Sequence, residues 1–151
     1  MQLNRYIFIP LLLLCGQLFS QVKTLQAIRI AQAPTIDGNL DEPAWKNASV
    51  ATDFIQNFPT FGIPASQKTT VLLAYDNSAI YIGAYLYDDP SLIRKQITSR
   101  DAEQQSDVDY FSVFLDTYKD DQNGFQFLVT SANVQTDAKM GPNLGGGFGS
   151  F

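Results

Sequence analysis

Apolar and polar residues alternate along two pairs of segments in this chain, with a turn inside each pair. Residues 67–75 and 79–87 are rich in β-branched and aromatic residues and are separated by an Asp-Asn-Ser turn. Residues 108–117 and 125–131 alternate in the same way, and the segment between them ends in Asn-Gly. Each pair predicts a β-hairpin, because an apolar period of two indicates a strand and these turn residues favour tight reversals.

The second strand of the first predicted hairpin has two largely apolar faces. One face carries Ile80, Ile82, Ala84 and Leu86, and the other carries Tyr81, Gly83, Tyr85 and Tyr87. This pattern predicts a central strand with other parts of the protein packed on both sides.

Shorter elements are predicted nearer the N-terminus. Residues 27–31 and 35–36 favour short strands, and residues 41–48 favour one or two helical turns, with Asp41 as the cap and Pro43 in the first turn. Many strands and no long helical period predict an all-β fold, an antiparallel β-sandwich of the jelly-roll kind with one short helix.

The two ends of the chain differ from this middle part. Residues 1–20 combine Arg5, an apolar stretch and a small-residue end, which is typical of a secretory signal peptide cleaved after Ser20. We therefore expect export to the periplasm, the outer membrane or the extracellular space. The sandwich is assigned to residues 21–140, and the glycine-rich residues 141–151 are expected to lead into a longer protein.

The amino-acid composition excludes several kinds of catalytic and ligand-binding site. The chain has no histidine, which excludes serine triads, Cys–His dyads and His-ligated zinc or haem. Met140 is the single haem-ligand candidate left after cleavage, so haem is not an expected partner. A net charge of -5 argues against nucleic acid and anionic membranes as partners.

Three segments together resemble a known family. Residues 34–45 (Pro-Thr-Ile-Asp-Gly-Asn-Leu-Asp-Glu-Pro-Ala-Trp), 71–86 and 109–116 are similar to the opening, the hairpin and the "D-x-x-x-x-F-x-D" strand of carbohydrate-binding module family 9. The resemblance implies a β-sandwich that binds a polysaccharide or oligosaccharide, often with calcium. A closer subgroup consists of exported bacterial proteins in which such a module precedes a large outer-membrane domain, so the C-terminal remainder of a longer protein is an expected partner.

Candidate sugar-binding residues are aromatic, acidic or basic, because sugars bind to ring faces and to charged planar groups. They are Trp45, Tyr85, Tyr87, Arg100, Asp107 and Asp109. Trp45 and the tyrosines can also be core residues, and for these three the core interpretation is favoured. Sugar-binding members of the family carry a tryptophan where this chain has residues 104–107, and an Arg and an Asn where it has Leu128 and Thr130.

An acidic segment offers a candidate metal site. Asp116, Asp120, Asp121 and Asn123 could supply oxygen ligands for calcium, the one cofactor considered. A solvated hairpin turn explains the same residues and is favoured.

These observations favour a non-catalytic carbohydrate-binding module of an exported envelope protein, one that serves a hydrolase in carbohydrate catabolism. One alternative is an assembly or docking domain of an outer-membrane protein that has lost sugar binding. A second is a hydrolase acting on O-glycosyl bonds, but no carboxylate pair stands out and no catalytic residue is assigned.

Overall fold

The structure is a computed structural model, and it describes residues 23–97, 99–100 and 107–142 of the chain. The predicted signal peptide, residues 1–20, and most of the glycine-rich end lie outside the described residues. No helix within the described part of the chain is long and apolar enough to cross a membrane.

The first sheet is built around one strand, β3 (Thr69–Tyr75). On one edge β3 pairs antiparallel with β4 (Ile80–Leu86) over its full length. Its other edge is shared by β2 (Ser49–Ala51), which is antiparallel, and β1 (Ile28–Arg29), which is parallel. β3 is therefore the central strand.

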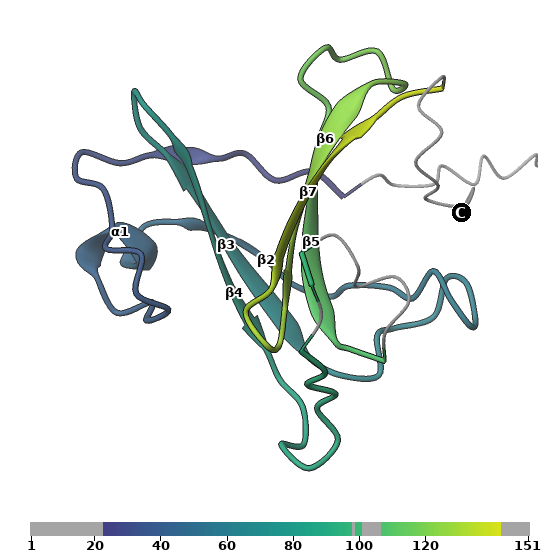
Figure 1. Cartoon of the computed structure of the whole chain (residues 1–151). Helices are drawn as coiled ribbons and strands as arrows, with labels where there is room; N and C mark the ends of the chain where they lie inside the picture. The colour runs from purple at the N-terminus through teal and green to yellow at the C-terminus, as the bar shows by residue number, and fades with distance from the viewer. Residues whose placement is uncertain (1–22, 98, 101–106, 143–151) are drawn as a thin grey trace, which may run out of the picture.

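The second sheet has three antiparallel strands in sequence order. These are β5 (Tyr110–Leu115), β6 (Gly124–Thr130) and β7 (Gln135–Met140). Figure 1 shows the two sheets converging where the chain crosses from β4 toward β5 and diverging toward the β3–β4 turn. The result is a two-layer all-β fold whose layers are splayed at one end.

One short helix, the only one in the described part of the chain, packs on the outer face of the first sheet. This helix, α1 (Pro43–Lys46), places Trp45 against Ala48 and the fully buried Ala74 of β3. Leu40 and Trp45 also lie over Gly83 of β4, where a Cβ atom would stand 2.7 Å from Leu40 Cδ2 and 3.3 Å from Trp45 Cη2. Small residues at positions 74 and 83 thus make room for the indole, which forms the main core cluster.

The predicted fold class and both hairpins are confirmed. The first hairpin is β3–β4, and the second is β5–β6. The short strand predicted at 27–31 and the helix predicted at 41–48 also form, each over fewer residues.

Three local predictions are wrong. Residues 35–36 are not a strand, because Thr35 N donates to the Glu42 side chain and so anchors the loop before α1. The residue at the helix cap is Glu42 rather than Asp41, and no side chain caps the helix. Finally, β4 is an edge strand: among the described residues it pairs with β3 alone, although Trp45 and Leu40 do cover one of its faces.

Gly83→Val tests the close approach of Trp45 to β4. The added side chain meets Leu40 and Trp45, so we expect the free energy of unfolding to fall by about 1–3 kcal/mol. Urea denaturation followed by the fluorescence of Trp45, the only tryptophan, measures this directly. Ala84→Val is the matched control, since it enlarges the opposite face of the same strand. Equal losses in the two variants would contradict the packing described for Gly83.

Candidate functional site

A pocket of about 490 Å³ lies where the two sheets converge, and we call it the mouth pocket. It is lined by the ends of β3 and β4, the crossing segment after β4, and the facing ends of β5 and β6. The lining residues are Gln67, Thr69, Leu86, Tyr87, Asp88, Ile93, Arg94, Val108, Asp109, Tyr110, Phe111, Val129, Thr130 and Ser131. Its size and its mixture of apolar and polar groups are typical of small-ligand sites.

Two tyrosines give this pocket exposed aromatic surface. Tyr87 follows β4 directly and is held there because its backbone N–H donates to the Lys68 carbonyl at 3.0 Å. Tyr110 begins β5, opposite Thr130 of β6. The two residues are 49% and 51% exposed, respectively, so about half of each is open to a ligand.

The surroundings of Tyr87 are partly polar. The Lys68 ammonium lies 5.1 Å from the centre of its ring, a cation–π distance, and the Tyr85 ring is 6.3 Å away at an angle of 38°. Beside them, Gln67 Nε2 donates to Asp88 Oδ1 at 3.1 Å. An aromatic face is thus bordered by donors and acceptors that could meet hydroxyl groups.

Arg94 joins the crossing segment to the second sheet at the floor of this pocket. Its backbone N–H donates to Asp109 Oδ2 at 2.9 Å, and its Nε and Nη2 donate to Asp109 Oδ1 at 3.1 and 2.9 Å. Nη1 donates to Asp107 Oδ1 at 2.8 Å. The hydroxyl of Ser131, just after β6, donates to the Arg94 carbonyl at 2.6 Å.

These contacts set the charge at the site. The backbone N–H of Arg94 and then its guanidinium hold the pKa of Asp109 below its ordinary value, against the opposing effect of burial. The two carboxylates in turn raise the pKa of Arg94. The ion pairs are largely solvent-exposed, so each adds little stability. Their main effect is to fix the geometry of the pocket floor.

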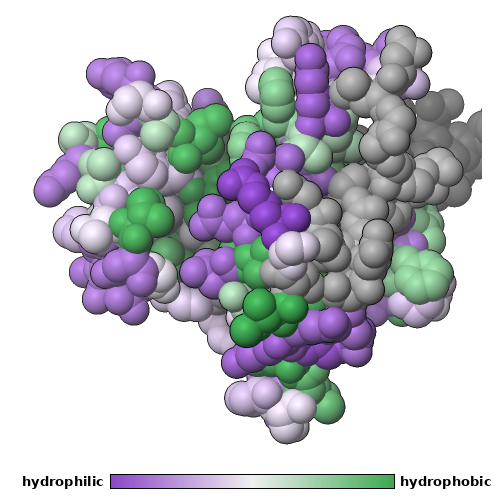
Figure 2. Space-filling model, in the orientation of Figure 1, coloured by the Kyte–Doolittle hydropathy of each residue, from purple (hydrophilic) through white to green (hydrophobic). Residues whose placement is uncertain are grey.

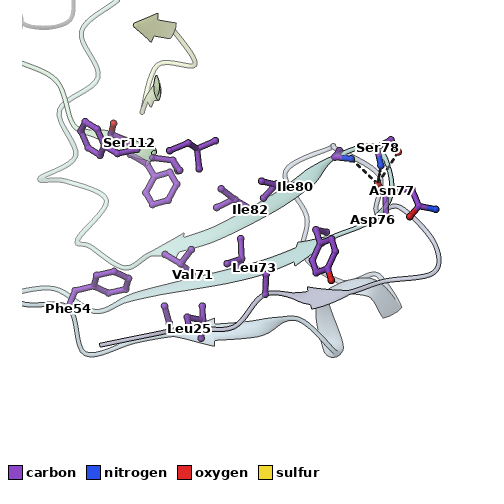
Figure 3. Close-up of a pocket in the computed structure, with 18 residues that line it drawn as sticks. Leu25, Phe54, Val71, Leu73, Asp76, Asn77, Ser78, Ile80, Ile82 and Ser112 are labelled. Atoms are coloured by element: carbon purple, nitrogen blue, oxygen red, sulfur yellow. Dashed lines mark hydrogen bonds between the residues drawn. The ribbon is translucent and has the colours of Figure 1, made fainter. Parts of the chain in front are cut away.

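A second and larger hollow, of about 830 Å³, opens between the splayed parts of the two sheets; we call it the inter-sheet groove. Figure 2 shows hydrophobic residues reaching the surface along this hollow. In Figure 3, Val71 and Leu73 of β3 and Ile80 and Ile82 of β4 project toward the strand that carries Ser112. Residues 111–115 of β5 form the opposite wall.

One carboxylate lines this groove, and it is already bound. Asp76 Oδ1 accepts hydrogen bonds from the backbone N–H groups of Ser78 and Ala79, and Asp76 Oδ2 accepts one from the Tyr81 hydroxyl at 2.8 Å. These bonds, led by the one from the Ser78 N–H, lower the pKa of Asp76 to about 2 and raise that of Tyr81. The carboxylate is therefore engaged in the turn rather than offered to a ligand.

The structure separates the six residues predicted to bind sugar. Tyr87 and Asp109 line the mouth pocket, Asp107 is tied to its floor through Arg94, and Tyr85 lies beside Tyr87. Arg100 instead pairs with Asp137 of β7. Trp45 is only 4% exposed and has no open ring face, as its core interpretation requires. Leu128 and Thr130, which stand where the family has polar contacts, are both buried.

The acidic segment at 116–123 is organised as a turn. The Asp116 carboxylate accepts backbone hydrogen bonds from residues 118–121, and Asp120 accepts three from Gln122 and Asn123. These bonds lower the pKa of both carboxylates. Among the residues that the structure describes, no three acidic or cysteine side chains gather as metal ligands. The geometry gives these residues the turn role, and calcium binding there remains a prediction.

Several residues of the mouth pocket were not found from the sequence, among them Tyr110, Arg94, Gln67 and Asp88. For Tyr110 the available signal was an aromatic residue within a predicted strand. Arg94 had no such signal, since its role depends on two aspartates 13 and 15 residues away.

No family model, curated protein or solved structure matches the chain.

The hydrogen bonds of Asp76 predict how the free energy of unfolding depends on pH. Because its pKa is about 2 in the folded chain, against 3.8 ordinarily, the ionised carboxylate stabilises the fold above about pH 4. That contribution is lost as the pH falls through 2. We expect Asp76→Ala to lower the free energy of unfolding at pH 7, and its difference from the unaltered protein to shrink steadily between pH 4 and 2.

Urea denaturation at several pH values measures this difference. Asp41→Ala is the control, because no hydrogen bond of its side chain is found in the described structure. A gap between Asp76→Ala and the unaltered protein that stays constant down to pH 2 would show that the charge of Asp76 contributes nothing.

Proposed function

We propose that the chain is a non-catalytic carbohydrate-binding module that holds a glycan in the mouth pocket. The observation that carries the proposal is the pair of half-exposed tyrosines, Tyr87 and Tyr110, that flank a pocket with a polar floor. Sugar rings bind through C–H contacts to aromatic faces and through hydroxyl hydrogen bonds to fixed polar groups. The pocket offers both, on the ends of strands.

The roles of the residues follow from their positions. Tyr87 and Tyr110 supply the aromatic surfaces, and Gln67 and Asp88 supply a donor and an acceptor at the rim. Arg94, held by Asp107 and Asp109, keeps the crossing segment in place beneath them. The resemblance to carbohydrate-binding module family 9 supports the same function, although residues 104–107 include no aromatic residue where sugar-binding members of that family carry a tryptophan.

The proposal includes the setting of the module. The signal-peptide pattern of residues 1–20 supports export to the cell envelope or beyond. There the module would hold a polysaccharide close to a hydrolase, and calcium could assist.

A second function is supported by a separate observation, the inter-sheet groove. Soluble monomeric proteins rarely expose an apolar hollow of this size, and large exposed apolar areas usually mark interaction sites. The chain could therefore serve as an assembly domain for an outer-membrane partner, alone or together with glycan binding.

Affinity electrophoresis on gels that contain soluble polysaccharides tests the first function. We expect one or more glycans to retard the protein, and Tyr87→Ala and Tyr110→Ala each to weaken binding by about tenfold or more, as the loss of a buried aromatic contact implies. The runs are repeated with calcium and with a chelator.

Tyr118→Ala is the matched control, because Tyr118 is an exposed tyrosine in the 116–123 turn, outside the mouth pocket. Circular dichroism confirms folding of each variant. Retardation that survives in both pocket variants, or no retardation by any glycan under either calcium condition, would rule out this site.

A further inference from the structure

We propose that the inter-sheet groove receives one extended, uncharged polypeptide strand of a partner, which pairs with the free edge of β4. This inference deepens the second function above and rests on it, while glycan binding in the mouth pocket is independent of it. Strand addition to an open sheet edge is a recurring mode of recognition, in which backbone bonds give affinity and alternate side chains give specificity.

Within the described structure, the free edge of β4 carries none of the features that usually protect a sheet edge. Among the described residues β4 pairs with β3 alone, in an unbroken register from Ile80 opposite Tyr75 to Leu86 opposite Thr69. The strand has no charged residue, no proline and no bulge. Proteins usually protect exposed edges with one of these features, because a bare edge presents unpaired N–H and C=O groups.

The side chains next to this edge form one wall of the groove. Ile80 and Ile82 point into it, alongside Val71 and Leu73 of β3 (Figure 3). Ile80 is 57% exposed and Leu86, at the other end of the strand, is 54% exposed. A strand added to β4 would continue this wall and place every second side chain in the groove.

The groove lining favours an uncharged strand as its occupant. The groove lining includes one charged residue, Asp76, and its carboxylate is bound by Ser78, Ala79 and Tyr81. An acidic or basic side chain inside the groove would therefore lose its hydration without gaining a partner, which is costly.

The same reasoning disfavours a second copy of this chain. An antiparallel β4–β4 pair that keeps the faces aligned is centred on Gly83 and sets Ile80 opposite Leu86 of the other copy. Continued by two residues, that register brings Asp88 and Asp89 of one copy to the Asp76 turn of the other. Like charges then meet at both ends, in a chain whose net charge is already -5.

A synthetic peptide that copies β3 is a suitable probe, because β3 pairs with the opposite edge of β4 and shares its apolar alternation. The peptide repeats residues 69–75, which include no charged side chain, as the proposed occupant requires. A second peptide carries proline at the position of Leu72, where it blocks backbone pairing. Each is labelled at its N-terminus, and its binding to the 151-residue chain is followed by fluorescence anisotropy.

We expect saturable binding of the first peptide, none of the proline peptide, and slower amide hydrogen exchange in β4 when the first is bound. Ile80→Lys and Ile82→Lys, which change groove residues outside the mouth pocket, are expected to weaken binding by about tenfold or more, because lysine blocks an edge. Leu92→Lys is the matched control, since Leu92 is exposed but lies outside the groove. Trp45 fluorescence confirms that each variant is folded.

Several results would overturn the proposal. These are no saturable binding to the folded chain, equal binding of both peptides, and unchanged affinity in Ile80→Lys and Ile82→Lys. A concentration-dependent dimer that excludes the peptide would assign the groove to a second copy instead. The glycan assay is run on the same variants, so a failure of strand binding is distinguished from a failure of glycan binding.

Discussion

The fold depends on the hydrogen bonding of β3 along both of its edges. This strand pairs with β4 on one side and with β2 and β1 on the other, so one strand holds three others. Its outer face carries Ala74, whose small side chain lets Trp45 pack directly on the sheet. Backbone pairing and this packing support each other, because the indole also covers Gly83 on the neighbouring strand.

The main buried cluster lies outside the space between the sheets. A β-sandwich ordinarily buries the facing surfaces of its two sheets against each other. Here the best-buried cluster lies on the outer face of the first sheet, under α1, while Val71, Leu73 and Ile82 on the inner face border an open groove. Both sites therefore occur between the sheets: the mouth pocket where the sheets converge and the groove where they separate.

The sequence was sufficient to predict the elements that local patterns define. Both hairpins follow from the apolar period and turn residues, and Asp76 shows why the first turn forms, since its carboxylate binds the amides of the turn. β7 was missed because Gln135–Met140 is mostly polar and is a strand through its pairing with β6. β2 was missed because three residues carry too little pattern. The edge position of β4 could not be predicted either, since an apolar pattern does not reveal which strand is the neighbour.

The candidate site was predicted in part for a similar reason. Residue type was enough to find Tyr87 and Asp109, whereas the contacts of Arg94 depend on the chain crossing between sheets, which no local pattern encodes. Type alone also made Trp45 a candidate, but its aromatic ring serves the core, which is the interpretation that its place after residues 36–38 favoured.

The Asp116 turn has a consequence for how the surface responds to solvent. Its loop is exposed, yet the backbone amides of residues 118–121 all donate to one carboxylate. The loop is exposed to solvent, but we expect its hydrogen-bonded amides to exchange with deuterium more slowly than free amides. We also expect a loop held in one conformation to be cleaved less readily by proteases. A stretch with many aspartates can thus be among the more durable parts of an acidic protein's surface.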